Sequence, residues 1–251
     1  MNENDYKYIL EIFPEVEMCF SYGSGVFQQE GYDYNKQSSS LPVIDLILVV
    51  NDPIEWHRKN LEKNSSHYTS IFNTKSLINF IQGPNSSGVA IWFNLEVPLN
   101  LPNQPNRLMK YGVVKTSNFI NDLVHWNYLY LAGRLHKPVT IFSDMNSEVY
   151  QVIQKAIYIN RMSALKVAIL SLPHQFSETD LYLTIAGLSY RGDPRMLFAE
   201  NPNKVKNIVL PNIESFRLIY EPIIQDLSDL STPTSALYSL TPISIASPSQ
   251  S

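Results

Sequence analysis

The stretch VEMCFSYGSG, residues 16–25, joins a short apolar run to a turn that places two glycines around one serine. Residues 16–23 predict a buried strand, because they are few and mostly apolar. Glycine permits positive φ and lets another group approach the backbone closely. A Gly-Ser-Gly turn after such a strand therefore indicates a cradle for an anion, although turns of this kind also serve chain reversal alone.

A second apolar run, VIDLILVV at residues 43–50, carries a single charged side chain, Asp45. An ionised carboxylate inside a buried strand is costly unless a cation or a hydrogen-bond donor accompanies it. Mg²⁺ bound to Asp45, with the triphosphate of a nucleotide held by Gly23 and Ser24, would explain both the aspartate in the second strand and the glycine turn after the first. This combination favours nucleotidyl transfer, and the alternative is a hydrogen-bonded aspartate in the core.

The remaining signals predict an α+β fold with a mixed sheet of four or more strands. Asp52 as N-cap and Pro53 in the first turn predict a helix over 53–63. Residues 87–97 and 106–114 predict two strands joined by a hairpin loop. Helical spacing then predicts a helix ending at Gly133, one or two helices over 147–173, a helix capped by Ser177 and Asp180, and a last helix over 212–229.

These patterns divide the chain into three parts. We expect a first domain over 1–115, a helical domain over 116–230 and a disordered Ser/Pro-rich tail over 231–251. The net charge of −4 without a clustered basic run argues against nucleic acid as a partner. A single cysteine excludes a disulfide framework and a zinc cluster, and no apolar run approaches the roughly 20 residues that span a bilayer.

Six motifs, in order, give the chain a specific resemblance over roughly residues 10–222. It resembles the mitochondrial phosphatidate cytidylyltransferases, also called mitochondrial translocator assembly and maintenance proteins. The motifs are YGSGVFQQ (22–29), IDLILVV (44–50), WHRKNLEKNSSHY (56–68), KYGVV (110–114), DLVHWNYLYLAGRLHKPV (122–139) and IAGLSYRGDPRM (185–196).

The resemblance implies a nucleotidyltransferase domain followed by a winged-helix-like helical domain. It implies an enzyme that uses Mg²⁺ to convert CTP and phosphatidate into CDP-diacylglycerol and pyrophosphate, an early step of cardiolipin and phosphatidylglycerol synthesis. The implied location is the matrix side of the mitochondrial inner membrane, where the uncharged tail predicts only weak peripheral attachment. A homo-oligomer is left open.

The residues alone are also compatible with two other functions. One is a nucleotidyltransferase with a non-lipid acceptor. The other is a non-catalytic mitochondrial assembly factor, because Ile47 stands where nucleotidyltransferases usually carry a second carboxylate.

The expected site residues fall into three groups. Asp45 is the predicted metal ligand, and Asp45, Asp122 and Lys110 are the predicted catalytic residues. The alternatives are capping or surface solvation near a helix start for Asp122, and simple exposure on a strand for Lys110. Asp193 and Arg195 could also form a local salt bridge, and cations such as Arg134 and Lys137 are favoured at a helix C-terminus in any case. The predicted substrate-binding residues are Gly23, Ser24, Gly25, Arg134, Lys137, His57, Asn60, Tyr111, Ser189, Asp193 and Arg195.

Overall fold

The computed structural model describes residues 3–30, 41–68, 74–102, 104–143, 146–191 and 203–230. The chain forms two compact units, residues 1–160 and residues 161–251. Each unit has its own core and is described by itself.

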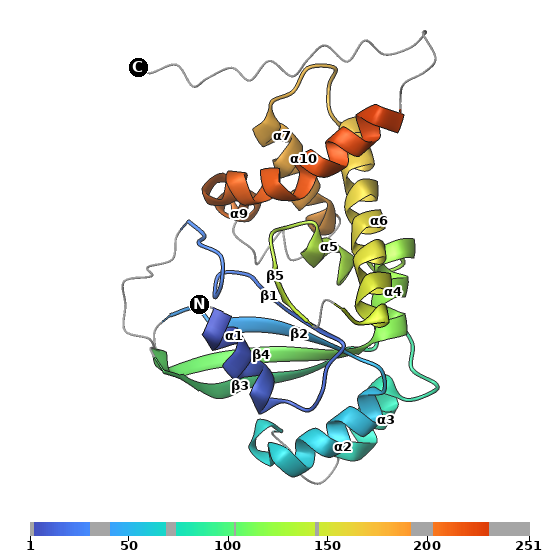
Figure 1. Ribbon diagram of the computed structural model, residues 1–251. Coiled ribbons are helices and arrows are strands. Elements are labelled where there is room, and N and C mark those ends of the chain that lie inside the picture. The colour runs from blue at the N-terminus through green and yellow to red at the C-terminus, as the bar shows by residue number, and fades with distance from the viewer. Residues whose placement is uncertain are drawn as a thin grey trace. The chain divides into compact units, whose positions relative to one another are not determined.

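The first unit is built on a five-stranded mixed sheet with the strand order β3-β4-β2-β1-β5 (Figure 1). Strand β2 pairs parallel with β4, and every other neighbouring pair is antiparallel. Tyr22 of β1 lies opposite Asp45 of β2, which in turn lies opposite Lys110 of β4. The strands are β1 (Met18–Tyr22), β2 (Ile44–Val50), β3 (Trp92–Leu101), β4 (Gln104–Lys115) and β5 (Thr140–Phe142).

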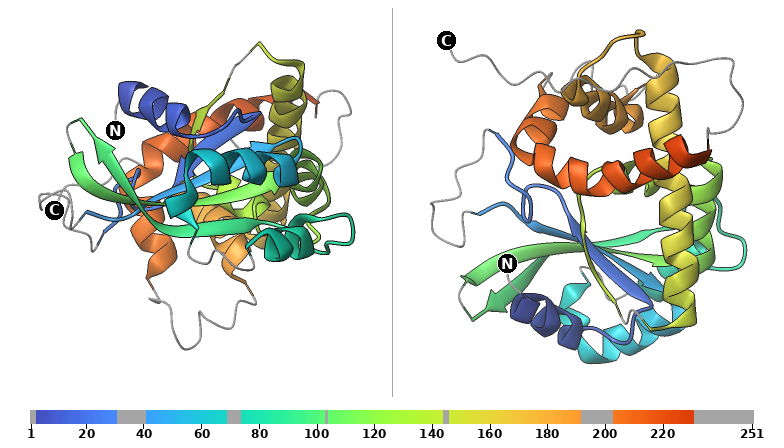
Figure 2. Two further views of the ribbon diagram at one scale, coloured as in Figure 1. Left: turned by 90° about the horizontal axis from the view of Figure 1, so that it is seen from below. Right: turned by 45° about the horizontal axis from the view of Figure 1, so that its top comes forward.

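Helices cover both faces of this sheet. On one face, α1 (Glu3–Ile12) and α2 (Pro53–Lys63) contribute Ile9 and Trp56 to a core with alternate residues of β1, β2 and β4. These two helices lie side by side beneath the sheet (Figure 2, right). On the other face, α4 (Thr116–His125), α5 (Ala132–Leu135) and the first part of α6 (Glu148–Ser171) pack on the remaining residues of the same strands. Helix α3 (Thr74–Gln82) contacts α2 and β3.

The second unit is helical in its described residues. It contains the end of α6, α7 (Glu178–Gly187), α9 (Lys204–Val209) and α10 (Ile213–Leu230), with short 3₁₀ turns η3 (Leu188–Tyr190) and η4 (Leu210–Asn212). Three buried rings, those of Tyr182, Phe216 and Tyr220, pack together between α7 and α10. Arg217 joins the same helices through an ion pair of 2.8 Å with Glu178.

The α+β class and the mixed sheet are confirmed. Local sequence signals also predicted the exact first residue of some helices. Helix α2 spans 53–63 as predicted, because Asp52 accepts hydrogen bonds from the N–H groups of Ile54 and Glu55. Helix α7 begins with the predicted capping box, in which Ser177 and Asp180 bond each other's backbone N–H.

Other predictions were wrong in their bounds. The helix expected to end at Gly133 ends at His125, since Trp126 and Leu129 adopt left-handed conformations with φ of 55° and 54°. Strand β3 begins at Trp92, not at residue 87. The sequence patterns also missed α1, α3 and the three-residue strand β5.

The domain boundary expected at 115/116 stays a prediction. The chain divides into its two compact units between residues 160 and 161. The physical reason is that α4, α5 and β5 complete the first sheet and its core, so they belong with it. The expected tail, 231–251, lies outside the described residues.

Candidate active site

The turn after β1 brings the backbone of Gly23 next to Asp45. Gly23 has φ of +78°, and its carbonyl accepts hydrogen bonds from the N–H groups of Val26 and Phe27. A Cβ added at Gly23 would lie 3.2 Å from Oδ2 of Asp45. Glycine is therefore required here by the left-handed backbone, and its small size leaves the carboxylate accessible from the turn.

Gly25 is required for a different reason. A Cβ at this position would lie 2.2 Å from the carbonyl oxygen of Val43 and 2.9 Å from Cα of Ile44. The turn is thus packed against the backbone where β2 begins, which explains this glycine without a ligand. Ser24, between the two glycines, is partly exposed, and its hydroxyl forms no hydrogen bond within the described part of the chain.

Asp45 and Lys110 form an ion pair across β2 and β4. Oδ1 of Asp45 lies 2.9 Å from Nζ of Lys110, and the two side chains keep 22% and 35% of their surface exposed. Burial alone would lower the pKa of Lys110, but the hydrogen bond and charge of Asp45 outweigh it and raise that pKa, so the ammonium stays charged. Nζ also lies 5.5 Å from the centre of the Phe93 ring. The predicted carboxylate and lysine are therefore brought together.

A second cation, Arg134 of α5, stands beside the same pair. Its guanidinium lies over the rings of Tyr22 and Tyr130, at 5.1 and 4.1 Å from their centres. Burial raises the pKa of the Tyr22 phenol, and the charge of Arg134 partly offsets that rise. Since Tyr22 lies opposite Asp45 in the strand register, Arg134 belongs to the same end of the sheet.

Tyr22 was missed by the sequence analysis. Its only signal was its place directly before Gly23, which is not informative without the strand register. We call Gly23, Ser24, Asp45, Lys110 and Arg134, with the ring of Tyr22, the charged end of the sheet.

Asp122 and Lys137 have other contacts. One carboxylate oxygen of Asp122 accepts the backbone N–H groups of Leu131 and Ala132, at 2.6 and 3.0 Å, and the side chain is buried. Asp122 thus caps α5 and fixes the segment that carries Arg134, which is the capping role weighed as its alternative. Lys137, two residues after the end of α5, donates from Nζ to the carbonyl of Gly133 in that helix.

His57, Asn60 and Tyr111 lie on the opposite face of the sheet from Asp45. All three are fully buried or nearly so, with exposures of 1%, 0% and 0%. Nδ2 of Asn60 donates to the hydroxyls of Tyr68 and Tyr111, both at 2.9 Å. We call His57, Asn60, Tyr68, Gln82 and Tyr111 the sealed network.

The protonation of His57 follows from its partners. Nε2 lies 2.9 Å from Oε1 of Gln82, whose amide nitrogen donates to the carbonyls of Ala90 and Val113, so Nε2 carries the proton. Nδ1, at 2.7 Å, then accepts from the hydroxyl of Tyr68. Burial lowers the pKa of His57 to about 4, which keeps the ring neutral at pH 7. The structure does not bring these predicted substrate-binding residues to the charged end.

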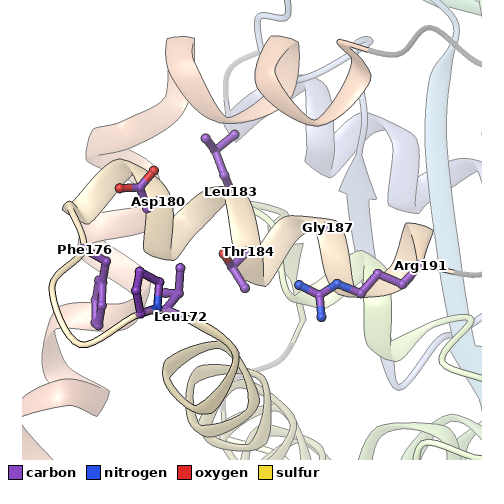
Figure 3. A pocket seen from close by; sticks show the side chains of 8 residues that line it. Leu172, Phe176, Asp180, Leu183, Thr184, Gly187 and Arg191 are labelled. Carbon is purple, nitrogen blue, oxygen red and sulfur yellow. The ribbon is translucent and has the colours of Figure 1, made fainter.

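The second unit holds the last predicted site residues. Ser189 lies in η3, while Asp193 and Arg195 lie outside the described residues. A hollow of about 440 Å³ lies between the end of α6 and α7. Leu172 and Phe176 gather at one end of it and Arg191 at the other (Figure 3). Asp180, on its wall, is already engaged in the capping box.

The charged end offers one carboxylate for a metal. Ile47, two residues after Asp45, is fully buried in the core, and the described residues include no cluster of three or more His, Cys, Asp or Glu side chains. Mg²⁺ is commonly held by one or two carboxylates together with substrate phosphates and water. A partly exposed carboxylate next to a hydroxyl and an open glycine turn fits that ion.

The sequence of this chain matches that of a known protein family. The family model for "Phosphatidate cytidylyltransferase, mitochondrial" matches residues 6–241. The chain belongs to this family.

Curated relatives named mitochondrial phosphatidate cytidylyltransferase agree with that assignment. The protein of Xenopus laevis is 42% identical over 223 residues, which are 88% of this chain and 62% of that protein. The human protein is 44% identical over 224 residues, 88% of this chain and 46% of its own length. The protein of Schizosaccharomyces pombe is 39% identical over 226 residues, which are 89% of this chain and 53% of that protein. The chain thus spans about half to two thirds of the relatives it matches.

In this member of the phosphatidate cytidylyltransferase family, the matched region contains both the charged end and the sealed network. Among the helices that the structure describes, none is long and apolar enough to cross a bilayer.

Proposed function

We propose that this chain transfers the cytidylyl group of CTP to phosphatidate. A phosphate oxygen of phosphatidate attacks the α-phosphorus of CTP, the bond from that phosphorus to the bridging oxygen breaks, and pyrophosphate leaves with the bond's electrons. The product is CDP-diacylglycerol. The observation that carries this proposal is the partly exposed Asp45 carboxylate, paired with Lys110 beside the Gly23 turn, in a chain of this family.

The charged end supplies position and opposing charge, which are the main requirements of phosphoryl chemistry. Backbone N–H groups of the turn and the free hydroxyl of Ser24 would bind oxygens of the triphosphate. Arg134, which stays charged between two tyrosine rings, would face the phosphates of CTP or of the lipid. These contacts would align the attacking oxygen with the departing pyrophosphate.

Asp45 would be the ligand of Mg²⁺. When bound, this ion neutralises phosphate charge and polarises the α-phosphoryl group. Lys110 now occupies Oδ1 of Asp45, so nucleotide binding would release the ammonium from the carboxylate and make it available to a phosphate. Lys110 thereby keeps the carboxylate paired before substrate arrives.

The family also motivates a location. We propose peripheral attachment to the matrix side of the mitochondrial inner membrane, where the product would enter cardiolipin and phosphatidylglycerol synthesis. The relatives are named as mitochondrial enzymes, which supports the organelle.

One assay tests the reaction. The purified chain is incubated with labelled CTP, Mg²⁺ and phosphatidate, and in parallel with RNA as the acceptor. We expect labelled CDP-diacylglycerol with the lipid and no label on RNA. Label on RNA would support a different nucleotidyltransferase, and folded protein without any product would support a non-catalytic assembly factor.

A further inference from the structure

A large groove opens on the first unit beside the charged end. It lies between residues 79–91, which include the end of α3 and the loop after it, and residues 128–130, which precede α5. Its volume is about 850 Å³, toward the upper end of the roughly 300–1,000 Å³ of ligand pockets. We call it the tyrosine groove after Tyr128 and Tyr130.

The lining of the tyrosine groove is uncharged. Its described residues include no acid, no base and no histidine, and most of them are aliphatic or aromatic, including Phe80, Ile81, Val89 and Ile91. Such a wall cannot pair with a triphosphate, so it suits an uncharged and mainly apolar part of a ligand.

The mouth of the groove exposes large rings to solvent. Phe80 keeps 81% of its surface exposed and Tyr128 keeps 57%. Exposed aromatic side chains beside an apolar groove are a common feature of surfaces that meet lipids or apolar ligands. An acyl chain that leaves a bilayer would therefore meet exposed aromatic rings at the groove.

Two series of contacts connect the groove to Asp45. In one, Tyr130 of the groove lies against Arg134, which lies over Tyr22, the strand partner of Asp45. In the other, Ile91 of the groove and Phe93 both border Gly112, and Phe93 lies beneath Lys110. Residues that line the groove thus lie next to the side chains that contact both cations, Arg134 and Lys110.

We propose that the tyrosine groove binds the acyl chains of the lipid acceptor while its phosphate group lies at Arg134 and Lys110. This inference rests on the proposed function and adds where the lipid lies. An apolar groove joined to a pair of cations matches an amphiphile with an anionic head. The cytosine ring of CTP is the other uncharged group in the reaction, and it is an outcome of the test below.

Three variants test the groove kinetically. Phe80→Ser removes an apolar wall, Ser87→Trp fills the groove from its exposed loop, and Leu77→Ser is the matched control, because Leu77 is 45% exposed on the same helix without lining the groove. Each is assayed with long-chain phosphatidate in vesicles and with dihexanoyl phosphatidate in solution.

We expect Phe80→Ser and Ser87→Trp to raise KM for the long-chain lipid about tenfold or more, since each buried methylene is worth about 0.8 kcal/mol. KM for CTP and for the short-chain lipid should change less than about twofold. Ser87→Trp adds apolar surface, so a higher KM for the long-chain lipid in that variant cannot come from weaker adsorption of the protein to the vesicle. A rise in KM for CTP with the lipid unaffected would instead assign the groove to cytosine, and effects equal to those of Leu77→Ser would overturn the proposal.

A binding experiment separates this inference from the reaction itself. Phosphatidate with a photoreactive diazirine on its acyl chain is crosslinked to the full chain, and the labelled peptides are mapped. Label within 79–91 and 128–130, lost in Ser87→Trp, supports the groove even if no CDP-diacylglycerol forms. Label confined to other segments would overturn it even if the reaction proceeds.

Discussion

Lys110 and Tyr111 are neighbours on β4, yet they face two different chemical environments. The ammonium of Lys110 meets Asp45 at the charged end, where both side chains remain partly exposed. The hydroxyl of Tyr111, on the opposite face, contacts the buried Asn60 at 2.9 Å and the partly buried His67 at 3.0 Å. Polar residues of one motif are thus divided between the two faces of one sheet.

The difference separates structural from functional polar groups. In the sealed network each polar side chain is paired with others, so the network stabilises the fold and has little capacity left for a ligand. At the charged end Asp45 and Lys110 remain partly exposed, Arg134 lies beside them, and the Ser24 hydroxyl forms no hydrogen bond within the described part of the chain. Changes at the charged end should therefore reduce activity in a folded protein, and changes in the network should reduce stability in an active one.

Asp45→Asn should give the largest effect. We expect kcat/KM for CTP to fall about 10³-fold, because a neutral amide holds Mg²⁺ poorly and several kcal/mol of phosphate charge stabilisation is lost. The free energy of unfolding should change by less than about 1 kcal/mol, since the ion pair is partly exposed. Steady-state kinetics and urea unfolding measure the two quantities.

Asp52→Asn is the matched control for that substitution. Asparagine caps a helix as well as aspartate, and Asp52 only caps α2. Activity should stay near that of the unchanged chain. Near-normal activity of Asp45→Asn would remove the metal role from the charged end.

His57 should make stability depend on pH. Its pKa is about 4 in the folded chain and 6.5 when exposed, so between these values the unfolded state binds more protons. Its contribution is complete above pH 6.5 and is lost as the pH falls toward 4, by about 3 kcal/mol in total.

Urea unfolding of the unchanged chain and of His57→Gln, at several pH values from 7 to 4, isolates this effect. The difference between the two stabilities should shrink as the pH falls. A difference that stays constant across the range would show that His57 is not held neutral by burial.

The adjacent pair on β4 compares the two faces most closely. Lys110→Met should lower kcat/KM for CTP about 100-fold, as for the loss of a donor to a developing charge, with little change in stability. Tyr111→Phe should instead lower stability and leave activity nearly unchanged. The free energy of unfolding should fall by about 1–3 kcal/mol, because Asn60 and His67 lose a buried partner, and kcat/KM should stay within about twofold of the unchanged chain. Equal losses of activity in both variants would abolish the distinction between the faces.

Ser24→Ala should give the smallest effect. One hydrogen bond to a phosphate oxygen is worth about 1 kcal/mol, so KM for CTP should rise about fivefold with kcat nearly unchanged. Ser66→Ala, on the exposed η2 turn (Ser65–His67), should change neither constant. A change in kcat alone would place Ser24 away from the ground-state nucleotide.

Sequence patterns predicted those parts of the fold that short-range chemistry determines. Asp52 with Pro53, and Ser177 with Asp180, specify helix starts within a few residues, and β1 and β2 are apolar enough to be recognised. Strand β5 has only three residues and forms because β1 offers an open edge, which no local pattern records.

The candidate site was predicted in part for the same reason. Gly23, Asp45 and Lys110 were recognised by type and position, and the structure brings them together. His57 and Asn60 are polar residues in a matched motif, and only the packing of α2 shows that they are sealed away. Tyr111 could have been excluded from the site on sequence alone. Successive residues of a strand point to opposite faces, and its neighbour Lys110 was already expected to face the site.

The most direct test of the charged end is a crystal structure of the chain with CTP and Mn²⁺ in place of Mg²⁺, with the anomalous signal of manganese used to locate the ion. We predict a peak within about 2.2 Å of a carboxylate oxygen of Asp45, with the triphosphate against the Gly23 turn. A metal and triphosphate bound away from Asp45, with its ion pair to Lys110 intact, would contradict the account.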